Sequence, residues 1–339
     1  MRLLLLILLV LSGLGCAERT SPAGEEHLLL LQNHDYVVGL LPKVGGRVVV
    51  FRRIDGDNVL LSDPSQWGQA GPEVSATSSW TTYNGHITWI GPQDDWWTKQ
   101  DLNTKRKEKA SRWPPDPWLV FGDYAISEQS PTSVVLTGPS SPVSGLALRK
   151  QYDLRDDGLH VSVTATNTSD AEVSWDLWSN TRFDARDTAT YVPLPEKGAF
   201  WIDPFRTNSP LKRGPLFYRI IGTHFTIPVD SSSSPGVENH NVKYFMDPGA
   251  PYLAAVSPSD CFIKHITIAE GKPAPAHGRV EIYNHRTARG ALLEVEHHGA
   301  YTTLQAGDSM SLSERWELHP YTGDTTPEAQ AAFVAALFE

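Results

Sequence analysis

Short runs of apolar residues, separated by residues that favour turns, recur along most of this chain. Tyr36–Leu41 and Arg47–Arg52 are rich in Val, Leu and Phe, and the turn sequence Asp55–Asn58 follows them. In Leu159–Thr166 apolar and polar residues alternate, which is typical of a strand with one buried and one exposed face. A period of two predicts β-strands rather than helices over most of the chain.

The same pattern predicts a series of strands joined by short connections. A hairpin is expected at Asp156-Asp157-Gly158, between two of these strands. The further predicted strands are Leu28–Leu31, Trp118–Ile126, Ser133–Leu136, Leu146–Leu154, Leu159–Asn167, Glu172–Trp178, Arg279–Tyr283, Ala291–His298 and Ser309–Leu318.

One helix is predicted, at residues 326–338 near the C-terminus. Thr326 can cap it, Pro327 suits the first helical position, and the Glu328 carboxylate lies at the positive end of the helix dipole. Many short strands with almost no helix predict an all-β fold, either a sandwich or a barrel.

Two long stretches look irregular. Ser62–Pro117 is dense in Trp, Gly and Pro, and Thr181–Asn241 is rich in Pro, Ser and Asn. Long irregular segments within a compact domain are commonly functional or disordered. The tryptophans predict order in the first stretch, whereas Ser231–Pro235 predicts a mobile tip in the second.

The N-terminus has the layout of a secretory signal peptide. The basic Arg2 precedes an apolar run, Leu3–Leu11, and small residues in Ser12–Gly15 then lead to Cys16. The apolar run is shorter than the ~20 residues that a membrane-spanning helix needs. We therefore expect residues 1–15 to be a signal peptide that is removed on export.

The residues around the expected cleavage site resemble the lipobox of bacterial lipoproteins, in which a lipid-carrying cysteine follows the cut. Cys16 stands at that position, although Gly13 departs from the Leu that the pattern prefers. The resemblance implies lipidation of Cys16, with ordinary signal cleavage as the alternative. It also implies a bacterial cell-envelope location. Ala17, in place of Asp, resembles the sequences that are sorted to an outer membrane.

The mature chain is expected to consist of a tether and one domain. Residues 16–27 are polar, with Pro and Gly, and would link a membrane-anchored cysteine to a single domain at residues 28–339. If Cys16 carries a lipid, Cys261 has no cysteine partner, and a small buried side chain is the simplest interpretation of it.

Composition argues against some functions. With 29 Lys and Arg against 39 Asp and Glu, the formal net charge is −10 and no basic stripe is present, so nucleic acid is a poor candidate partner. No cysteine or histidine spacing typical of a zinc site occurs, and no cofactor or metal is predicted. The unusual feature is tryptophan, with 11 residues in the chain.

Three groups of segments stand out along the chain. They are Leu41–Val48 with Asn58–Leu61, Tyr83–Trp89 with Pro92, Gln93 and Trp96, and Leu293–His297 with Leu304–Ser309 and Glu314–Trp316. Together they resemble the galactose-mutarotase-like superfamily, and in particular an uncharacterised bacterial branch of it, domain of unknown function 4380. The resemblance covers about Tyr36 to Leu318 and implies a large all-β, two-sheet supersandwich with a short C-terminal helix.

In aldose epimerases of this superfamily, a glutamate on a late strand acts as the base that takes the proton of the anomeric hydroxyl. Glu294 matches that position, in the sequence Leu293-Glu294. Glu296 shares its face, because side chains on a strand alternate, and two neighbouring carboxylates can raise the pKa of one of them. The alternative is an exposed acidic strand face without catalytic function.

The family's acid is a histidine, and the matching stretch is Ser179–Phe183, which places Asn180 there. Because an amide has no titratable proton, standard epimerase activity is in doubt. Arg182 or Asp184 could substitute for the histidine, or the stretch could simply make turn hydrogen bonds.

A second group of candidate ligand-binding residues follows Gly85, where backbone can approach a ligand closely. His86, Trp89, Asp94 and Trp96 supply the aromatic faces and polar groups that bind sugars. The alternative is that the tryptophans fill the core.

The sequence thus predicts an exported cell-envelope carbohydrate-binding protein, with epimerase-type activity at Glu294 and Glu296 as an option. Its ligand is expected in a groove lined by His86, Trp89, Asp94, Trp96, Asn180, Arg182, Glu294 and Glu296. Two alternatives remain open. One is a non-catalytic structural or assembly lipoprotein. The other is a glycoside hydrolase or polysaccharide lyase that uses paired carboxylates.

Overall fold

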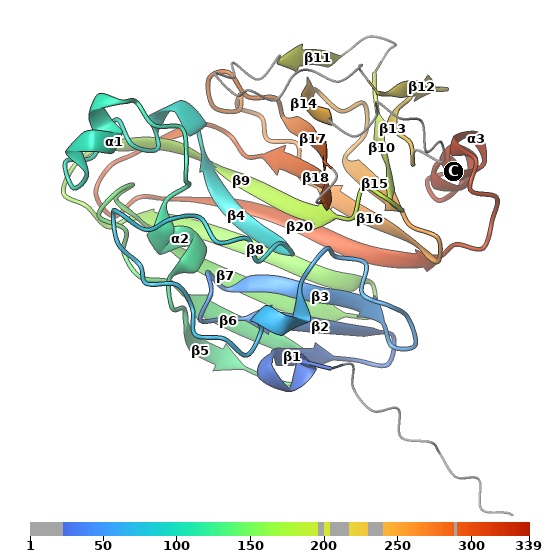
Figure 1. Ribbon diagram of the computed structural model, residues 1–339, viewed down its shortest axis with the longest axis horizontal. Helices are drawn as coiled ribbons and strands as arrows, with labels where there is room; N and C mark the ends of the chain where they lie inside the picture. Colours follow the sequence, from blue (N-terminus) through green and yellow to red (C-terminus); the bar gives the residue numbers. More distant parts are fainter. Residues whose placement is uncertain (1–22, 196–199, 204–216, 230–239, 288–289) are drawn as a thin grey trace, which may run out of the picture.

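The computed structural model describes residues 23–195, 200–203, 217–229, 240–287 and 290–339, which form two large antiparallel β-sheets (Figure 1). The predicted signal peptide, Cys16 and the predicted mobile tip at Ser231–Pro235 lie outside the described residues. The predicted all-β two-sheet fold is confirmed.

The first sheet runs in the order β1-β2-β3-β4-β9-β18-β17-β14-β11, and β19 pairs with β9 beside it. Neighbouring strands in the sheet come from distant parts of the sequence, so the sheet joins both halves of the chain. Its strands are β1 (Leu29–Gln32), β2 (Tyr36–Leu41), β3 (Arg47–Arg53), β4 (His86–Gly91), β9 (Val173–Phe183), β11 (Phe200–Asp203), β14 (His240–Met246), β17 (Val280–Thr287), β18 (Gly290–His298) and β19 (Thr302–Leu304).

The second sheet runs in the order β12-β13-β10-β15-β16-β20-β8-β7-β6-β5. The predicted hairpin is present, because β7 and β8 pair through Arg155 and Gly158. The strands are β5 (Ala125–Gln129), β6 (Ser133–Thr137), β7 (Leu146–Arg155), β8 (Gly158–Asn167), β10 (Ala189–Pro193), β12 (Arg219–Ile221), β13 (His224–Ile227), β15 (Tyr252–Val256), β16 (Asp260–Ile266) and β20 (Ser309–Pro320).

Helices are few and short among the described residues. The longest is α3 (Pro327–Ala336), where the Thr326 side chain accepts a hydrogen bond from the amide of Ala329, as predicted for a cap. The others are η1 (Glu25–His27), η2 (Pro64–Gln66), η3 (Gln93–Asp95), α1 (Thr104–Glu108) and α2 (Pro117–Phe121).

Three predictions of local structure were wrong. The stretch 62–117 was expected to be irregular, but β4 lies within it. The segment predicted as a strand from Trp118 begins instead with α2, because Asp116 accepts a hydrogen bond from the Trp118 amide and Pro117 occupies the first turn. The stretch 181–241 is less irregular than expected, since β10, β11, β12 and β13 lie within it. Apolar runs this short give a weak sequence signal.

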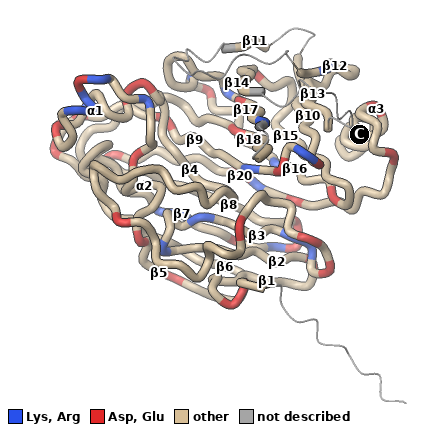
Figure 2. The backbone as a smooth tube through the Cα atoms, in the orientation of Figure 1, with Lys and Arg blue, Asp and Glu red and all other residues tan. Residues whose placement is uncertain are grey.

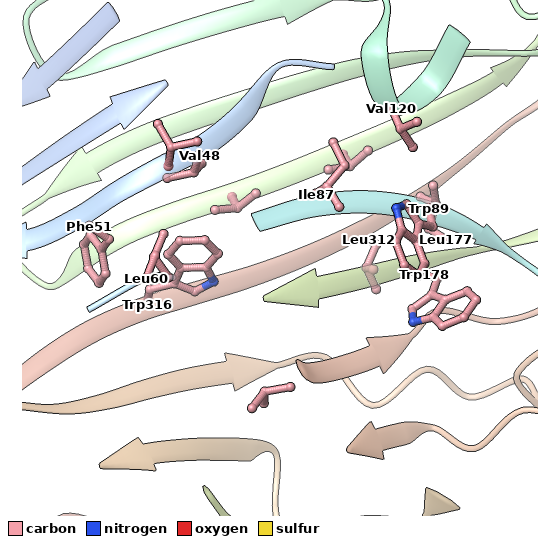
Figure 3. Close-up of a cluster of buried hydrophobic side chains, with 14 of the residues drawn as sticks. Val48, Phe51, Leu60, Ile87, Trp89, Val120, Leu177, Trp178, Leu312 and Trp316 are labelled. Carbon is pink, nitrogen blue, oxygen red and sulfur yellow. The ribbon is translucent and has the colours of Figure 1, made fainter. Parts of the chain in front are cut away.

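Aromatic side chains hold the two sheets together. Phe51 of the first sheet is fully buried, and its ring centroid lies 5.6 Å from that of Trp316 and 6.1 Å from that of Phe262, both in the second sheet. Figure 3 shows Phe51 with Leu60 and Trp316 at one end of the cluster of buried apolar side chains; Trp89 and Trp178, at its other end, lie on the opposite face of the first sheet. The sheets therefore share one continuous apolar interior.

The tryptophan-rich segment folds against the first sheet, next to β4 and β9. Trp96 and Trp97 are fully buried, and their indole N–H groups donate to the carbonyls of Ile90 and Pro114, both at 2.6 Å. A buried indole that finds such an acceptor combines a large apolar contact with a satisfied polar group. The predicted order of this segment is explained by core packing.

The described residues show no concentration of one charge and no membrane-spanning helix. Basic and acidic segments are interspersed along the backbone, and Figure 2 shows no single-sign stripe in that view. Cys261 is buried and free, as expected. No helix among the described residues has the length and apolarity to cross a membrane.

The contact between the sheets generates a stability prediction. Phe51→Ala should lower the free energy of unfolding by about 3–5 kcal/mol, because it removes a fully buried ring and leaves a cavity between the sheets. Urea denaturation checks this. The matched control is Ile126→Ala on β5, where a side chain that is 48% exposed should change stability by less than about 0.5 kcal/mol. Equal losses in the two variants would contradict the assignment of Phe51 to the core.

Candidate active site

Strand pairing brings polar residues of β9, β18, β17 and β14 onto one face of the first sheet. Residues that are directly opposite in an antiparallel pair share a face, and alternate residues of a strand do so too. The registers thus form two rows on the same face. One is Arg182, Glu294, Tyr283 and Lys243, and the other is Asn180, Glu296, Glu281 and Phe245.

We call this surface the polar face, defined by Asn180, Arg182, Glu294, Glu296 and Lys243. The opposite side of the same strands looks toward the second sheet. The predicted sharing of one face by Glu294 and Glu296 is confirmed by the register.

The centre of the polar face is an ion pair between Arg182 and Glu294. Arg182 Nη2 lies 2.7 Å from Glu294 Oε1, and the two side chains are only 3% and 7% exposed. Arg182 Nε also donates to Asn180 Oδ1 at 3.2 Å, and Nη1 donates to Asn84 Oδ1 at 3.3 Å. The guanidinium is therefore fixed by three side chains, and it orients the carboxylate of Glu294.

Tryptophan rings enclose the guanidinium of Arg182. Its central carbon lies 5.5 Å from the ring centroid of Trp80 and 5.5 Å from that of Trp89, within cation–π range. Trp113 continues this group, with its centroid 4.9 Å from that of Trp80, and it is 45% exposed. Trp80 and Trp89 thus lie between the partly exposed Trp113 and the ion pair.

Glu296 lies deeper than Glu294 and is fully buried. It accepts a hydrogen bond from Asn180 Nδ2 at 2.5 Å, and its other oxygen lies 2.8 Å from Lys243 Nζ. Burial raises the pKa of Glu296 to about 7, against the attraction of Lys243. Lys243 also lies 2.5 Å from Glu281 Oε2 and 4.3 Å from the Trp178 ring centroid. Its pKa is raised, because the nearby glutamates outweigh burial.

A second buried network continues from Glu281. Glu281 Oε1 lies 2.7 Å from His277 Nδ1 and 3.3 Å from His298 Nε2, and His298 Nδ1 lies 3.1 Å from Asp176 Oδ2. The two carboxylates raise the pKa of His298 to about 9 although burial opposes this. Lys243 and His277 help hold the pKa of Glu281 well below its ordinary value.

His277, Glu281 and His298 are residue types that can hold a metal ion, and their ligand atoms lie within 4.8 Å of one another. Two contacts disfavour this. Lys243 already places a positive charge on Glu281, and His277 Nε2 accepts a hydrogen bond from the Gln93 amide at 3.2 Å. A cation would compete with both. The geometry fits a hydrogen-bonded ionic network better than a metal centre.

His86 does not reach the polar face. It belongs to the other face of β4, where Nδ1 lies 2.9 Å from Thr181 Oγ1 and Nε2 lies 3.4 Å from Glu314 Oε1. Burial between the sheets holds the pKa of His86 well below its ordinary value. The glycine before it approaches protein backbone and not an open site, because a Cβ at Gly85 would lie 2.2 Å from the Val48 carbonyl oxygen.

Trp89, Asp94 and Trp96, which were predicted to bind a ligand together with His86, lie next to the polar face. Trp89 and Trp96 are buried, and their centroids lie 5.7 Å apart and within 6.0 Å of that of Trp178. Asp94 is half exposed and forms an ion pair with Arg112. The structure thus brings together Asn180, Arg182, Glu294 and Glu296 with Trp89 beside them, and it places His86 elsewhere.

Sequence reasoning missed Lys243, Glu281 and His298, which hold the charges around Glu296. Glu281 lies in the predicted strand Arg279–Tyr283, but polar and apolar residues do not alternate from Glu281 to His285, so the sequence does not indicate a polar face there. Lys243 also lies in a segment without such alternation, so only strand pairing reveals its place.

Comparison with known proteins supports the fold. The chain resembles a galactose mutarotase-like protein from Lactobacillus casei ATCC 334, with a TM-score of 0.51 and 16% identity over 86% of this chain and 100% of that chain. It also resembles a galactose mutarotase related enzyme from Lactobacillus acidophilus, with a TM-score of 0.50 and 11% identity over 89% and 99%. At such identities the likeness establishes the fold alone.

Two sequence comparisons complete the picture. A family model described as a domain of unknown function (DUF4380) matches residues 27–319. No curated protein matches the chain.

The charge network generates a pH prediction. Since the pKa of His298 is raised from 6.5 to about 9, its contribution to stability is complete below pH 6.5 and is lost as the pH rises through 9. The free energy of unfolding should fall over this range by on the order of 2–3 kcal/mol. The contribution of Glu296, whose pKa is raised from 4.5 to about 7, is complete below pH 4.5 and is lost as the pH rises through 7, before His298 titrates.

Urea denaturation at several pH values measures this loss. In His298→Gln the decline between pH 6.5 and 9 should be much smaller than in the wild type. His34→Gln, at a side chain that is 70% exposed, should leave the decline unchanged. An identical decline in wild type and His298→Gln would show that His298 does not carry the effect.

Proposed function

Because the chain belongs to the family described as a domain of unknown function (DUF4380), we propose a function from its site and fold: an exported protein that binds a carbohydrate at the polar face. The observation that carries the proposal is the Arg182–Glu294 ion pair, held between tryptophan rings at the edge of a partly exposed aromatic surface.

The residue types of the polar face suit a sugar ligand. Sugars present hydroxyl groups around the ring and C–H groups on its faces, so they combine with carboxylates, guanidinium groups and aromatic rings. Glu294 and Arg182 supply the first two, and the exposed ring of Trp113 supplies the third. The mutarotase-like fold adds support, because the similar structures include proteins described as galactose mutarotase-like.

Binding is better supported than standard epimerisation. The resemblance places Asn180 at the position of the family's acid, and the Asn180 amide donates to Glu296. Arg182 has no proton to give at neutral pH, and Glu296 is fully buried under its partners. Glu294 could still act as a base toward a bound sugar, so a slow anomerisation is the activity to look for.

We also propose that the protein is carried to the cell envelope and anchored there by a lipid on Cys16. The signal-like start of the chain and the small residues before Cys16 support this proposal. The folded body would then meet sugars outside the cytoplasm.

Substitution at the centre of the polar face tests sugar binding. Wild-type protein should bind at least one sugar in a calorimetric screen of mono- and oligosaccharides, and Glu294→Gln should weaken that binding at least about 10-fold, or about 1.4 kcal/mol, because the amide loses its charge-assisted hydrogen bonds. Glu172→Gln, on the exposed surface before β9, should bind like wild type.

Two further outcomes decide between the alternatives. Anomerisation followed by NMR, if present in wild type and absent in Glu294→Gln, would add epimerase-type activity to binding. If no sugar binds the wild type, or if Glu294→Gln binds the sugar as tightly as wild type does, the polar face is not a sugar site. The alternative of a structural lipoprotein would then be favoured.

The lipid anchor has a separate test. Cells that express the full chain and are grown with labelled palmitate should incorporate the label into wild-type protein and not into Cys16→Ala. Cys261→Ala is the matched control, since this buried cysteine should not affect labelling. Label retained in Cys16→Ala would refute lipidation at this residue.

A further inference from the structure

The second sheet has an internal gap beside β20. Strand β16 pairs with β20 only from Asp260↔Pro320 to Ile266↔Glu314, whereas β8 pairs with β20 down to Ser309↔Thr166. The N-terminal part of β20, Ser309–Ser313, is therefore paired on one side alone among the described strands. An unpaired edge presents backbone groups that can bond to a further strand.

The backbone directions along this edge follow from the ladder. The Asn167 amide donates to the Asp308 carbonyl at 2.9 Å, so even-numbered residues here bond toward β8 and odd-numbered residues face the other way. The Tyr321 amide agrees, because it donates to Ser259 on the β16 side at 2.9 Å. Ser309, Ser311 and Ser313 thus direct N–H and C=O groups into the gap, and no described residue bonds to them there.

A groove of about 370 Å³ lies in this gap. Its volume falls within the range of ligand sites in proteins. The lining includes Thr267 and Ala269 from the segment after β16, Gly299 and Ala300 from the turn after β18, and the floor residues Leu177 and Leu312. No charged residue lines it, although the chain has a net charge of −10.

The two sides of the edge differ in polarity. On the outer side, the hydroxyls of Ser309, Ser311 and Ser313 lie 2.8, 3.0 and 3.2 Å from hydroxyls of β8. On the inner side, Leu312 is buried and Met310 is half-buried. A ligand that continued the sheet would therefore place apolar groups inward and hydroxyl groups outward.

We propose that this groove binds an uncharged extended peptide segment of another protein, which adds to the sheet as a strand beside Ser309–Ser313. The backbone groups directed into the groove match a ligand with backbone amides at strand spacing, and the small residues Ala269, Gly299 and Ala300 leave room for its chain. A glycan is less suited, since no aromatic ring lines the groove.

The test uses a peptide whose pattern β20 already accepts on its other edge. The probe is an N-acetylated, C-amidated, fluorescently labelled peptide with the sequence of residues 159–167, in which Val161, Val163 and Ala165 alternate with polar residues. Fluorescence anisotropy should show saturable binding to the intact protein below about 1 mM. Ala300→Trp and Ala269→Arg, which fill the groove, should each weaken binding at least about 10-fold.

Controls separate strand addition from general stickiness. Ala125→Trp, on the exposed edge strand β5, should bind the peptide like wild type, and circular dichroism should show that every variant is folded. Two peptides N-methylated on alternate residues should differ, because only one set of amides faces the protein. Binding by both methylated peptides, insensitivity to the groove variants, or no binding of the unmodified peptide would overturn the proposal. The proposal would also be overturned if cellohexaose, and not the peptide, bound in the groove and Ala300→Trp weakened that binding.

Discussion

The pairing of β9 with β18 is the constraint on which the candidate site depends. Its register sets Arg182 opposite Glu294 and Asn180 opposite Glu296. A shift by one residue would move all four side chains to the interior between the sheets and bring Thr181, Val295 and their neighbours to the polar face. Leu293 and Val295 are fully buried in that interior. The shift would replace them there with the charged side chains of Glu294 and Glu296, which is unfavourable. The apolar packing between the sheets therefore fixes the position of the charges.

Those charges are tolerated because each has a partner. A carboxylate that leaves water loses several kcal/mol of solvation, and only close cations and hydrogen bonds offset this. Glu294 has Arg182, and Glu281 and Glu296 share Lys243. The pKa of Glu296 is nevertheless raised, which shows that Lys243 offsets its burial only in part. The polar face is thus an ordered network and not a surface patch of loose side chains.

Part of this arrangement could be predicted from the sequence. Alternation in Leu293–His297 is enough to place Glu294 and Glu296 on one face, and the strand pattern with the resemblance was enough for the fold. The role of Lys243 could not be predicted, since it depends on β14 pairing with β17. His86 was misplaced for a related reason. Residues next to a glycine in a polar stretch look accessible, but the register with Thr181 turns this histidine inward.

Similar charged residues have different surroundings on the two faces of the first sheet. Between the sheets, His86 and Lys264 each lie 3.4 Å from Glu314, and the three side chains are 2%, 0% and 3% exposed. On the polar face, Glu294 retains some exposure, and exposed Trp113 lies in the same aromatic group as Trp80, which contacts Arg182. Under the proposed function, the same residue types are structural between the sheets and meet a ligand on the polar face, near the exposed Trp113. The amide of Asn180 stabilises Glu296 from within the network. In the proposed site, Glu294 is then the carboxylate that meets the ligand.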